Sequence, residues 1–311
     1  MSFDYYASLD EKRTCPREVN ECGLAAGFVA ECTVWSCQCN PQDQKAPDPK
    51  NEARKLYINR AAKLELKLPR ELRIEPELAH LPNPSWFGID ISFILETPWY
   101  SKDDRPFHLL DNPVRKDRIF GIPFMSAASW KGLLRWAYGM NAGLVGACKE
   151  LDSGKIKKAK EQIVHLFGNE KDEQKKFRSG ALVFYPTWFD KIGFEVINPH
   201  SRKTRAGTIP IYYEVVPAGR EGRFRLLYAP LPGEIEKDKV KAADFIDNLI
   251  DAITALLETY GISAKRTVGW GTARIKTWTG FVKAGSFAPN TVEEFRKEIK
   301  NRIAQSKGGG Q

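Results

Sequence analysis

One carboxylate stands just upstream of a run of positive charge in the stretch LLDNPVRKDRIFGIPFMSAASWKGLLRWA, residues 109–137. It belongs to Asp111, and a proline turn and the start of a helix follow the basic run. Basic side chains bind phosphate, so this patch would hold a polyanion against Asp111. The other interpretation is a turn aspartate in LDNP, a residue type that caps nearby backbone and needs no chemistry. The residues alone fit both.

The helix that follows is a second candidate for anion binding. Ser126 is placed to cap its N-terminus, where backbone N–H groups attract phosphate. Lys131 and Arg135 are four residues apart and share one face, where their like charges repel unless an anion lies between them. Any amphipathic helix can carry two such bases by chance. Apolar residues at helical spacing predict a buried stripe on another face: Trp130, Leu133, Leu134 and Ala137.

A glycine-rich segment, GISAKRTVGWGTARI (residues 261–275), is the third candidate. Gly269 and Gly271 permit close backbone approach, and Lys265 and Arg266 supply charge. Trp270 can stack on a base or a sugar. The pattern is neither a Walker A loop nor a dinucleotide fingerprint. A glycine-rich turn between a helix and a strand fits equally well.

Residues 198–219 form a basic excursion between two strand-like segments. Such an arm can wedge into a nucleic acid, and it can also be an ordinary surface loop. No serine nucleophile elbow is present, and the four histidines are scattered. His108 and His200 lie beside basic segments and are the candidates for acid–base chemistry. The basic side chains of the excursion are Arg202, Lys203 and Arg205, next to His200.

Most of the six cysteines fall within the first forty residues. We expect a cytoplasmic chain, which argues against a disulfide framework. The segment CTVWSCQC lacks the paired spacing typical of structural zinc, so a zinc site and thiols in an irregular extension both fit. The zinc ligands would be Cys22, Cys32, Cys37 and Cys39.

The composition is that of a globular protein. Apolar residues make up 42% and charged residues 28% of the 311 residues, which excludes a disordered chain. A formal net charge of +9 favours a polyanionic partner, although many globular proteins are mildly basic. No apolar run approaches the roughly 18–20 residues that span a bilayer, and the N-terminus lacks a signal-peptide core.

Hydrophobic periodicity predicts the elements that position these residues. Strands are expected over residues 86–97, 179–189, 191–198, 223–231 and 272–282, and helices after Ser126 and over residues 157–168 and 239–262. In the first strand one face is apolar: Phe87, Ile89, Ile91 and Phe93. In the longest helix the core face is Phe245, Ile246, Leu249, Ile250, Ile253 and Leu257. This order suits an α+β fold, a ferredoxin-like or RNA-recognition-motif-like antiparallel sheet with helices on one face.

Three regions follow from this pattern. Residues 1–85 are expected to be a Cys-containing N-terminal extension, in which residues 39–52 look like a linker from their Pro, Asn and Asp content. Residues 86–285 would be the ferredoxin-like domain, with a thumb-like insertion near residues 198–219. Residues 286–311 would be a C-terminal helix and a flexible tail.

Three segments of the chain resemble, in their order along the sequence, motifs of the RAMP superfamily, the repeat-associated proteins of CRISPR effector complexes. GIPFMSAASWKGLLR resembles that family's turn-helix motif, usually IPGSSLKGALR, with departures at Phe124, Met125 and Ala127–Ala128. GISAKRTVGWGTARI is similar to its C-terminal glycine-rich loop. INPHSRKTRAG together with YYEVVPAGREGRFRLL resembles the segment that carries the thumb in type III backbone subunits. The resemblance covers residues 86–280.

The resemblance implies a Cas-seven-like backbone subunit of a CRISPR type III ribonucleoprotein in antiviral defence. Its partners would be guide RNA, target RNA and other CRISPR-associated subunits. LDNPVRKD resembles the arrangement before the turn-helix motif in subunits that cut target RNA, which places Asp111 on the catalytic aspartate. The helix start and the glycine-rich loop would hold the guide phosphates, and the thumb near residues 198–219 would splay the duplex. The implied RNA-binding residues are Ser126, Ser129, Lys131, Arg135, His200, Arg202, Lys203, Arg205, Lys265, Arg266, Gly269, Trp270 and Gly271.

The implied reaction is metal-dependent endoribonuclease cleavage within the complex, by attack of a 2′-hydroxyl on the neighbouring phosphate. Mg²⁺ or another divalent cation would assist Asp111, and RNA would supply further ligands because one carboxylate makes a weak metal site. Two alternatives remain open. One is a non-catalytic capping or structural RAMP subunit of the same kind of complex. The other is a guide-RNA-processing endoribonuclease that uses His108 or His200.

Overall fold

The computed structural model describes residues 49–72, 78, 80–104, 108, 110–144, 153–169, 178–199, 203, 207, 210–230 and 240–308. The chain divides into two compact units. The first unit combines the chain up to Arg70 with Tyr100–Phe124 and Phe189–Pro217, and the second combines Glu71–Trp99, Met125–Trp188 and Ala218–Gln311.

The second unit is built on a five-stranded antiparallel sheet. Its strand order is β3 (Leu182–Phe184), β7 (Glu221–Tyr228), β1 (Phe87–Leu95), β8 (Ala273–Val282) and β9 (Gly285–Phe287). The central strand β1 sets the register, with Ile91 opposite Phe224 on β7 and Trp278 on β8. A bulge at Ser92/Phe93 shifts the pairing with β8 toward its end.

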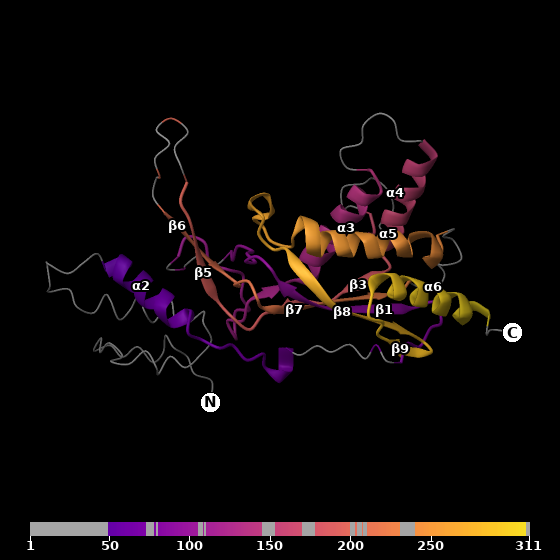
Figure 1. The fold of residues 1–311 in the computed structure, drawn as a ribbon, viewed down its shortest axis with the longest axis horizontal. Coiled ribbons are helices and arrows are strands. Elements are labelled where there is room, and N and C mark those ends of the chain that lie inside the picture. The colour runs from indigo at the N-terminus through magenta and orange to yellow at the C-terminus, as the bar shows by residue number, and fades with distance from the viewer. Residues whose placement is uncertain are drawn as a thin grey trace. The chain divides into compact units, whose positions relative to one another are not determined.

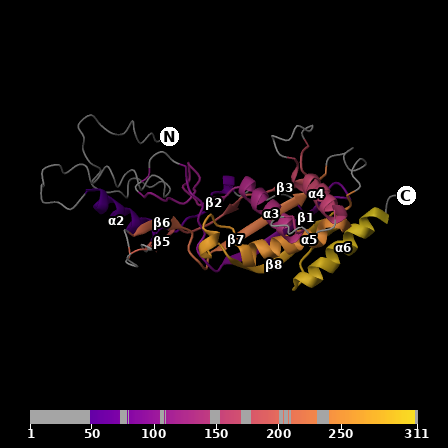
Figure 2. The ribbon, with the colours of Figure 1, turned by 90° about the horizontal axis from the view of Figure 1, so that it is seen from above.

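Helices cover one face of this sheet, as Figures 1 and 2 show for α3 (Ala127–Asn141) and α5 (Ala242–Ala255). Helix α4 (Ser153–Phe167) packs against α3, and α6 (Val292–Gly308) packs against α5 and β8. Helix α5 continues as a π-helical turn, Leu256–Tyr260, which ends at Gly261 with φ of 77°. The alternating apolar residues of β1 and the predicted core face of α5 are all buried between these layers.

The first unit contains helix α2 (Pro49–Ala61) and a hairpin of β5 (Gly193–Ile197) and β6 (Ile211–Val215). Figures 1 and 2 show α2 next to the hairpin. Their contact is a small apolar cluster around Tyr57 and Ala61 of α2, with Leu110, Ile192 and Phe194. The remaining short elements are 3-10 turns at Arg70–Leu72 and Arg266–Val268 and strands β2 (Phe124–Met125) and β4 (Thr187–Trp188).

The predicted α+β class with an antiparallel sheet is confirmed. The linker prediction is wrong at its C-terminal end, because Pro49–Glu52 form the first turn of α2. Proline supports this start, since its fixed φ suits the first helical position and its missing N–H is not needed there. Within the described residues, no helix combines the length and apolar character needed to cross a membrane.

Candidate functional site

Asp111 lies in an exposed turn of the first unit, where it pairs with Arg54 of α2. Nη2 of Arg54 donates to Oδ1 at 3.3 Å and to Oδ2 at 3.1 Å. The Asp111 side chain is 79% exposed and that of Arg54 24% exposed. The carboxylate is therefore open to a partner on one side and bound to a guanidinium on the other.

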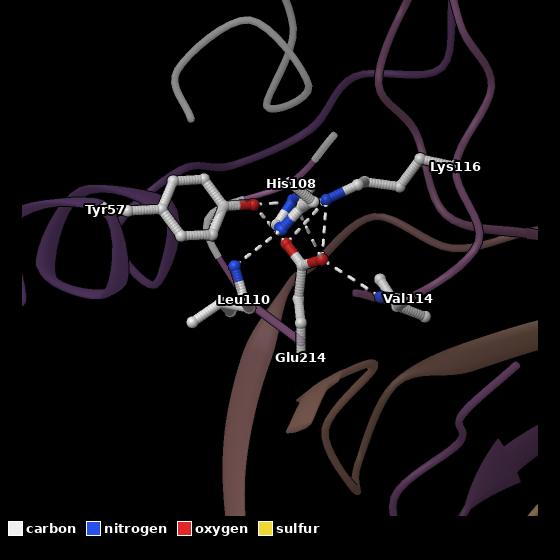
Figure 3. Close-up of polar contacts among 6 residues, drawn as sticks. All are labelled: Tyr57, His108, Leu110, Val114, Lys116 and Glu214. Atoms are coloured by element: carbon white, nitrogen blue, oxygen red, sulfur yellow. Dashed lines mark hydrogen bonds and ion pairs between the residues drawn. The ribbon is translucent and has the colours of Figure 1, made fainter. Parts of the chain in front are cut away.

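A buried charged network lies directly behind this turn (Figure 3). The side chains of Lys116 and Glu214 are both fully buried, and Nζ of Lys116 donates to both carboxylate oxygens at 2.6 Å. The Tyr57 hydroxyl donates to Glu214 Oε1, and the Val114 backbone N–H donates to Oε2 at 3.0 Å. Nε2 of His108 lies 3.9 Å from Oε2. Four donors or cations thus converge on one carboxylate.

These contacts determine the charge state of Glu214. Burial would raise the pKa of its carboxyl group, but the charges of Lys116 and His108 and the hydrogen bonds from Lys116 and Tyr57 outweigh burial. The pKa of Glu214 is held below its usual range, so the group is an anion at neutral pH. A buried pair is retained only with such extensive hydrogen bonding, because desolvation of each ion is costly.

The same network fixes the backbone on both sides of Asp111. The Glu214 backbone N–H donates to the Asn112 carbonyl at 3.0 Å, and Nδ2 of Asn112 donates to the Tyr212 carbonyl at 3.3 Å. The Leu110 N–H donates to Nδ1 of His108 at 3.1 Å. The turn is thereby tied to strand β6, and Asp111 projects from an anchored loop.

Two sequence predictions for this region need correction. Lys116, which belongs to the basic run, is buried with Glu214 and offers no charge to a polyanion. His108, a candidate for acid–base chemistry, has a side chain that is 3% exposed and that contacts the ring of Tyr57 edge-on at 5.3 Å. Its position is that of a packed histidine behind the turn.

Asp117 does not join Asp111 to form a metal site. Its Oδ1 accepts hydrogen bonds from the backbone N–H groups of Ile119 and Phe120, both at 2.9 Å, as in an Asx turn. Among the described residues, no group of three or more His, Cys, Asp or Glu side chains could hold a metal ion. One carboxylate already paired with a guanidinium does not fit a divalent cation held by the protein alone.

The helix start predicted at Ser126 is present in the second unit. Ser126 caps α3, and its Oγ accepts from the Ser129 backbone N–H at 3.1 Å and lies 2.9 Å from the Ser129 hydroxyl. Lys131 is partly exposed. Nη1 of Arg135 donates to the Gly168 carbonyl at 3.2 Å, so this base also joins α3 to the end of α4.

The glycine-rich loop reaches the same helix. The Arg266 guanidinium stacks on the ring of Trp136, which follows Arg135 on α3, at 4.4 Å from the centroid. Tyr260 packs edge-on against the same indole, with ring centroids 4.9 Å apart. Nη1 of Arg266 is buried without a hydrogen-bond partner among the described residues. The structure therefore brings together two of the predicted RNA-binding segments.

The glycines of this loop have different physical roles. Gly271 has φ of 87°, and a Cβ there would come within 2.6 Å of the Ser263 Cβ, so close packing requires glycine. Gly269 has φ of 82° but open space around it. Trp270 and Lys265 are partly exposed. The backbone of the loop closes through a hydrogen bond from Trp270 N–H to the Lys265 carbonyl at 3.3 Å.

Several predicted site residues lie outside the described residues. Of the predicted RNA-binding residues in the thumb-like insertion, only Lys203, an exposed turn residue, is described, whereas His200, Arg202 and Arg205 are not. The same holds for the proposed zinc ligands Cys22, Cys32, Cys37 and Cys39.

Sequence reasoning missed three side chains that shape these sites: Arg54, Glu214 and Trp136. Arg54 pairs with Asp111, and Glu214 pairs with Lys116, across long sequence separations. No local sequence pattern therefore links the members of either pair. Trp136 carried a usable signal. It falls outside the apolar stripe of α3, and a large aromatic residue on the polar face of a helix often has a partner of its own.

Comparisons with known proteins agree with this fold. A model of the RAMP superfamily matches residues 84–274. A search of curated proteins found no match. A chain of the "Cryo-EM structure of the Type III-B Cmr-beta bound to cognate target RNA" is similar at a TM-score of 0.54 and 13% identity, covering 85% of this chain and 96% of that one. A chain of a "Type IV-B CRISPR Complex" is similar at a TM-score of 0.41 and 14% identity, covering 60% and 90%.

The matched segment spans most of the chain and includes the capped start of α3, nearly all of the glycine-rich segment, strands β1 and β7, and the first two residues of β8. The protein belongs to the RAMP superfamily.

Proposed function

We propose that this protein is an RNA-binding backbone subunit of a CRISPR type III ribonucleoprotein. The observation that carries the proposal is the RAMP match across residues 84–274, which contains the α3 start and nearly all of the glycine-rich loop. The fold similarity to a chain from a type III-B complex bound to target RNA supports the same assignment. The net charge of +9 suits a phosphate backbone as ligand.

The guide RNA would bind where the loop meets α3. The capped helix N-terminus presents backbone N–H groups, Lys131 adds charge near the start of α3, and Arg266 adds charge against Trp136 further along the same helix. Trp136 holds the Arg266 guanidinium in one orientation, which lowers the entropy lost when the guanidinium binds a phosphate. Partly exposed Trp270 is available in the same loop for stacking on a base.

Within the complex, we further propose that Asp111 cleaves target RNA. An ionised carboxylate at an exposed turn can accept the proton of a 2′-hydroxyl, whose oxygen then attacks the adjacent phosphorus. The bond to the 5′-oxygen breaks, that oxygen takes a proton from water, and a 2′,3′-cyclic phosphate remains. If Mg²⁺ or another divalent cation takes part, the RNA has to supply most of its ligands, since the described part of the chain contains no ligand cluster.

A non-catalytic subunit of the same kind of complex is the second candidate. The observation that favours it is the ion pair of Asp111 with Arg54, because an aspartate that only stabilises the turn would make the same contact. Guide-RNA processing through His108 gains no support, because His108 is buried against Tyr57 and Glu214, while His200, the other candidate, lies outside the described residues.

The first experiment is purification of the tagged protein with its bound partners, followed by mass spectrometry and sequencing of the RNA. Repeat-derived guide RNA and other CRISPR-associated subunits are the expected result. Absence of RNA from a protein that is otherwise monodisperse would contradict the proposal.

Cleavage is then measured in the assembled complex with complementary target RNA. Asp111→Ala should abolish cleavage and leave target binding unchanged. The matched control is Asp104→Ala, because Asp104 is 78% exposed and pairs with Arg115 at 3.0 Å in the same unit. Equal cleavage by the Asp111 variant and the wild type would leave the non-catalytic subunit as the function.

A further inference from the structure

We propose that Arg54 is a catalytic residue of the target-RNA cleavage, binding the scissile phosphate next to Asp111. This inference rests on the proposed function of Asp111. Arg54 comes from helix α2, outside the residues 84–274 that match the family model, so it is a contribution of this chain's own N-terminal region.

The geometry places the Arg54 guanidinium beside the position that the scissile phosphate would occupy. Nη2 of Arg54 lies 3.1 and 3.3 Å from the two oxygens of Asp111. A phosphate group that binds this guanidinium is therefore a direct neighbour of the Asp111 carboxylate. The strong difference in exposure, 79% for Asp111 and 24% for Arg54, leaves the carboxylate side of the pair open to RNA.

Both members of the pair are attached to the same buried cluster. Arg54 precedes Tyr57 by three residues on α2, so the two side chains lie on one face of the helix. Tyr57 is fully buried and donates to Glu214. Asp111 follows Leu110, which packs against Tyr57 in that cluster. An exposed surface pair usually forms between mobile side chains, whereas here the backbone on each side is fixed.

The chemistry of the step explains why a cation is needed at this point. When the 2′-oxygen attacks phosphorus, negative charge accumulates on the non-bridging oxygens of the phosphorane. Asp111 accepts a proton but cannot stabilise that charge, and as an anion it repels the phosphate. A planar guanidinium offers N–H groups to two phosphate oxygens at once, and groups of this kind that are fixed in place favour the transition state. The carboxylate and the guanidinium thus have complementary roles.

Single-turnover cleavage by the assembled complex tests the proposal. Arg54→Ala should slow cleavage about 10²–10³-fold, the usual effect of removing one donor to a developing oxyanion. Arg54→Lys, which keeps the charge but loses the planar fork, should be intermediate. Binding of target RNA should stay within about threefold, because guide–target pairing dominates it. The matched control is Arg60→Ala, which removes an exposed arginine from the same helix α2 and should leave the rate unchanged.

A sulfur substitution separates phosphate contact from a structural role. In the wild type, replacing one of the two non-bridging oxygens at the scissile phosphate by sulfur should slow cleavage more than replacing the other. In Arg54→Lys this stereochemical difference should shrink, since the contact that creates it is weakened. A purely structural arginine would alter the rate for both sulfur isomers equally.

The outcomes separate this inference from the proposed function. If Asp111→Ala is inactive and Arg54→Ala cleaves at or above the wild-type rate, Arg54 is not catalytic, and a faster variant would identify it as a group that blocks Asp111. If Asp111→Ala cleaves normally, the proposed cleavage site itself is wrong. Where Arg54→Ala lowers assembly of the complex, the rate and the sulfur effect of Arg54→Lys decide.

Discussion

Replacing Lys116 by methionine would leave the Glu214 carboxylate buried without its principal counter-ion. Removing one partner of a buried pair costs about 3–5 kcal/mol, because the remaining charge stays desolvated. Lys116 fits this case, since both side chains have no exposed surface and Nζ contacts both carboxylate oxygens at 2.6 Å. We therefore expect Lys116→Met to destabilise the first unit by about 3–5 kcal/mol at neutral pH.

Hydrogen exchange at the Val114 amide measures this effect locally, because that N–H donates to Glu214 Oε2 at 3.0 Å. The expected loss of protection is about 10²- to 4 × 10³-fold, since each 1.4 kcal/mol corresponds to about tenfold. The control is Lys158→Met, which removes a lysine that is 63% exposed and lies 3.4 Å from Asp244. It should change stability by less than about 1 kcal/mol and leave Val114 exchange as it is.

The pH dependence gives a second readout with a definite sign. In the wild type the folded-state pKa of Glu214 lies below its unfolded value, so its contribution is present above the unfolded pKa and is lost as the pH falls through the folded pKa. In Lys116→Met, burial is no longer offset by the ammonium group, and the pKa of Glu214 rises. The gap in stability between variant and wild type should then narrow on acidification.

Adding Glu214→Gln to Lys116→Met should restore part of the loss, because the amide removes the buried charge, its oxygen can still accept from the Val114 N–H, and its NH2 group can donate to the Tyr57 hydroxyl oxygen. A Lys116→Met protein whose Val114 amide exchanges less than tenfold faster than in the wild type would refute the assignment of a desolvated ion pair to this network. So would a stability gap that is constant with pH, or a loss of protection in Lys116→Met no larger than that in Lys158→Met.

Three further predictions concern the second unit. Trp136→Ala should weaken guide-RNA binding about two- to fivefold in filter binding, because the cation–π contact with Arg266 at 4.4 Å contributes about 0.5–1 kcal/mol, and Trp136→Phe should retain most of it. Gly271→Ala should lower the melting temperature more than Gly269→Ala. Both alanines acquire left-handed backbone strain of about 1–2 kcal/mol, but only the one at position 271 also clashes with a packed neighbour. Equal shifts in melting temperature would contradict this reasoning. Ser126→Asp should keep the helix cap and the thermal stability but weaken RNA binding, because it places a negative charge at the helix start. Ser126→Ala should cost about 1 kcal/mol of stability. Unchanged RNA affinity in the aspartate variant would exclude a phosphate at the helix start.

Elements with a strong local pattern could be predicted from the sequence. Alternation along β1 and the continuous apolar face of α5 identified both as core elements, and all of those positions are buried. Ser126 was also recognisable, because a serine after a proline turn and before an apolar stripe is a typical helix cap. These features depend on residues within about one element of each other, which is the range that periodicity reports.

The environment of the candidate site depends on long-range contacts and could not be predicted in this way. Lys116 meets Glu214 almost a hundred residues later, and Arg54 meets Asp111 from just beyond the stretch expected to be a linker. The sequence of a basic run does not show which of its lysines is buried and which is solvated. What distinguishes them is the acidic residue placed opposite by the hairpin of β5 and β6, and no spacing rule contains that information.

The central position of β1 also has a consequence for how the chain is made. During synthesis β1 (Phe87–Leu95) emerges long before β7 (Glu221–Tyr228) and β8 (Ala273–Val282), the strands that flank it on either side. Until then the ribosome-bound chain holds a nine-residue strand that is apolar on one face and has neither edge hydrogen-bonded to its native neighbour. Closing such long loops is slow, and unpaired strand edges attract other chains. A ribosome stall between these strands should therefore yield aggregated nascent protein, whereas a stall after β8 should not.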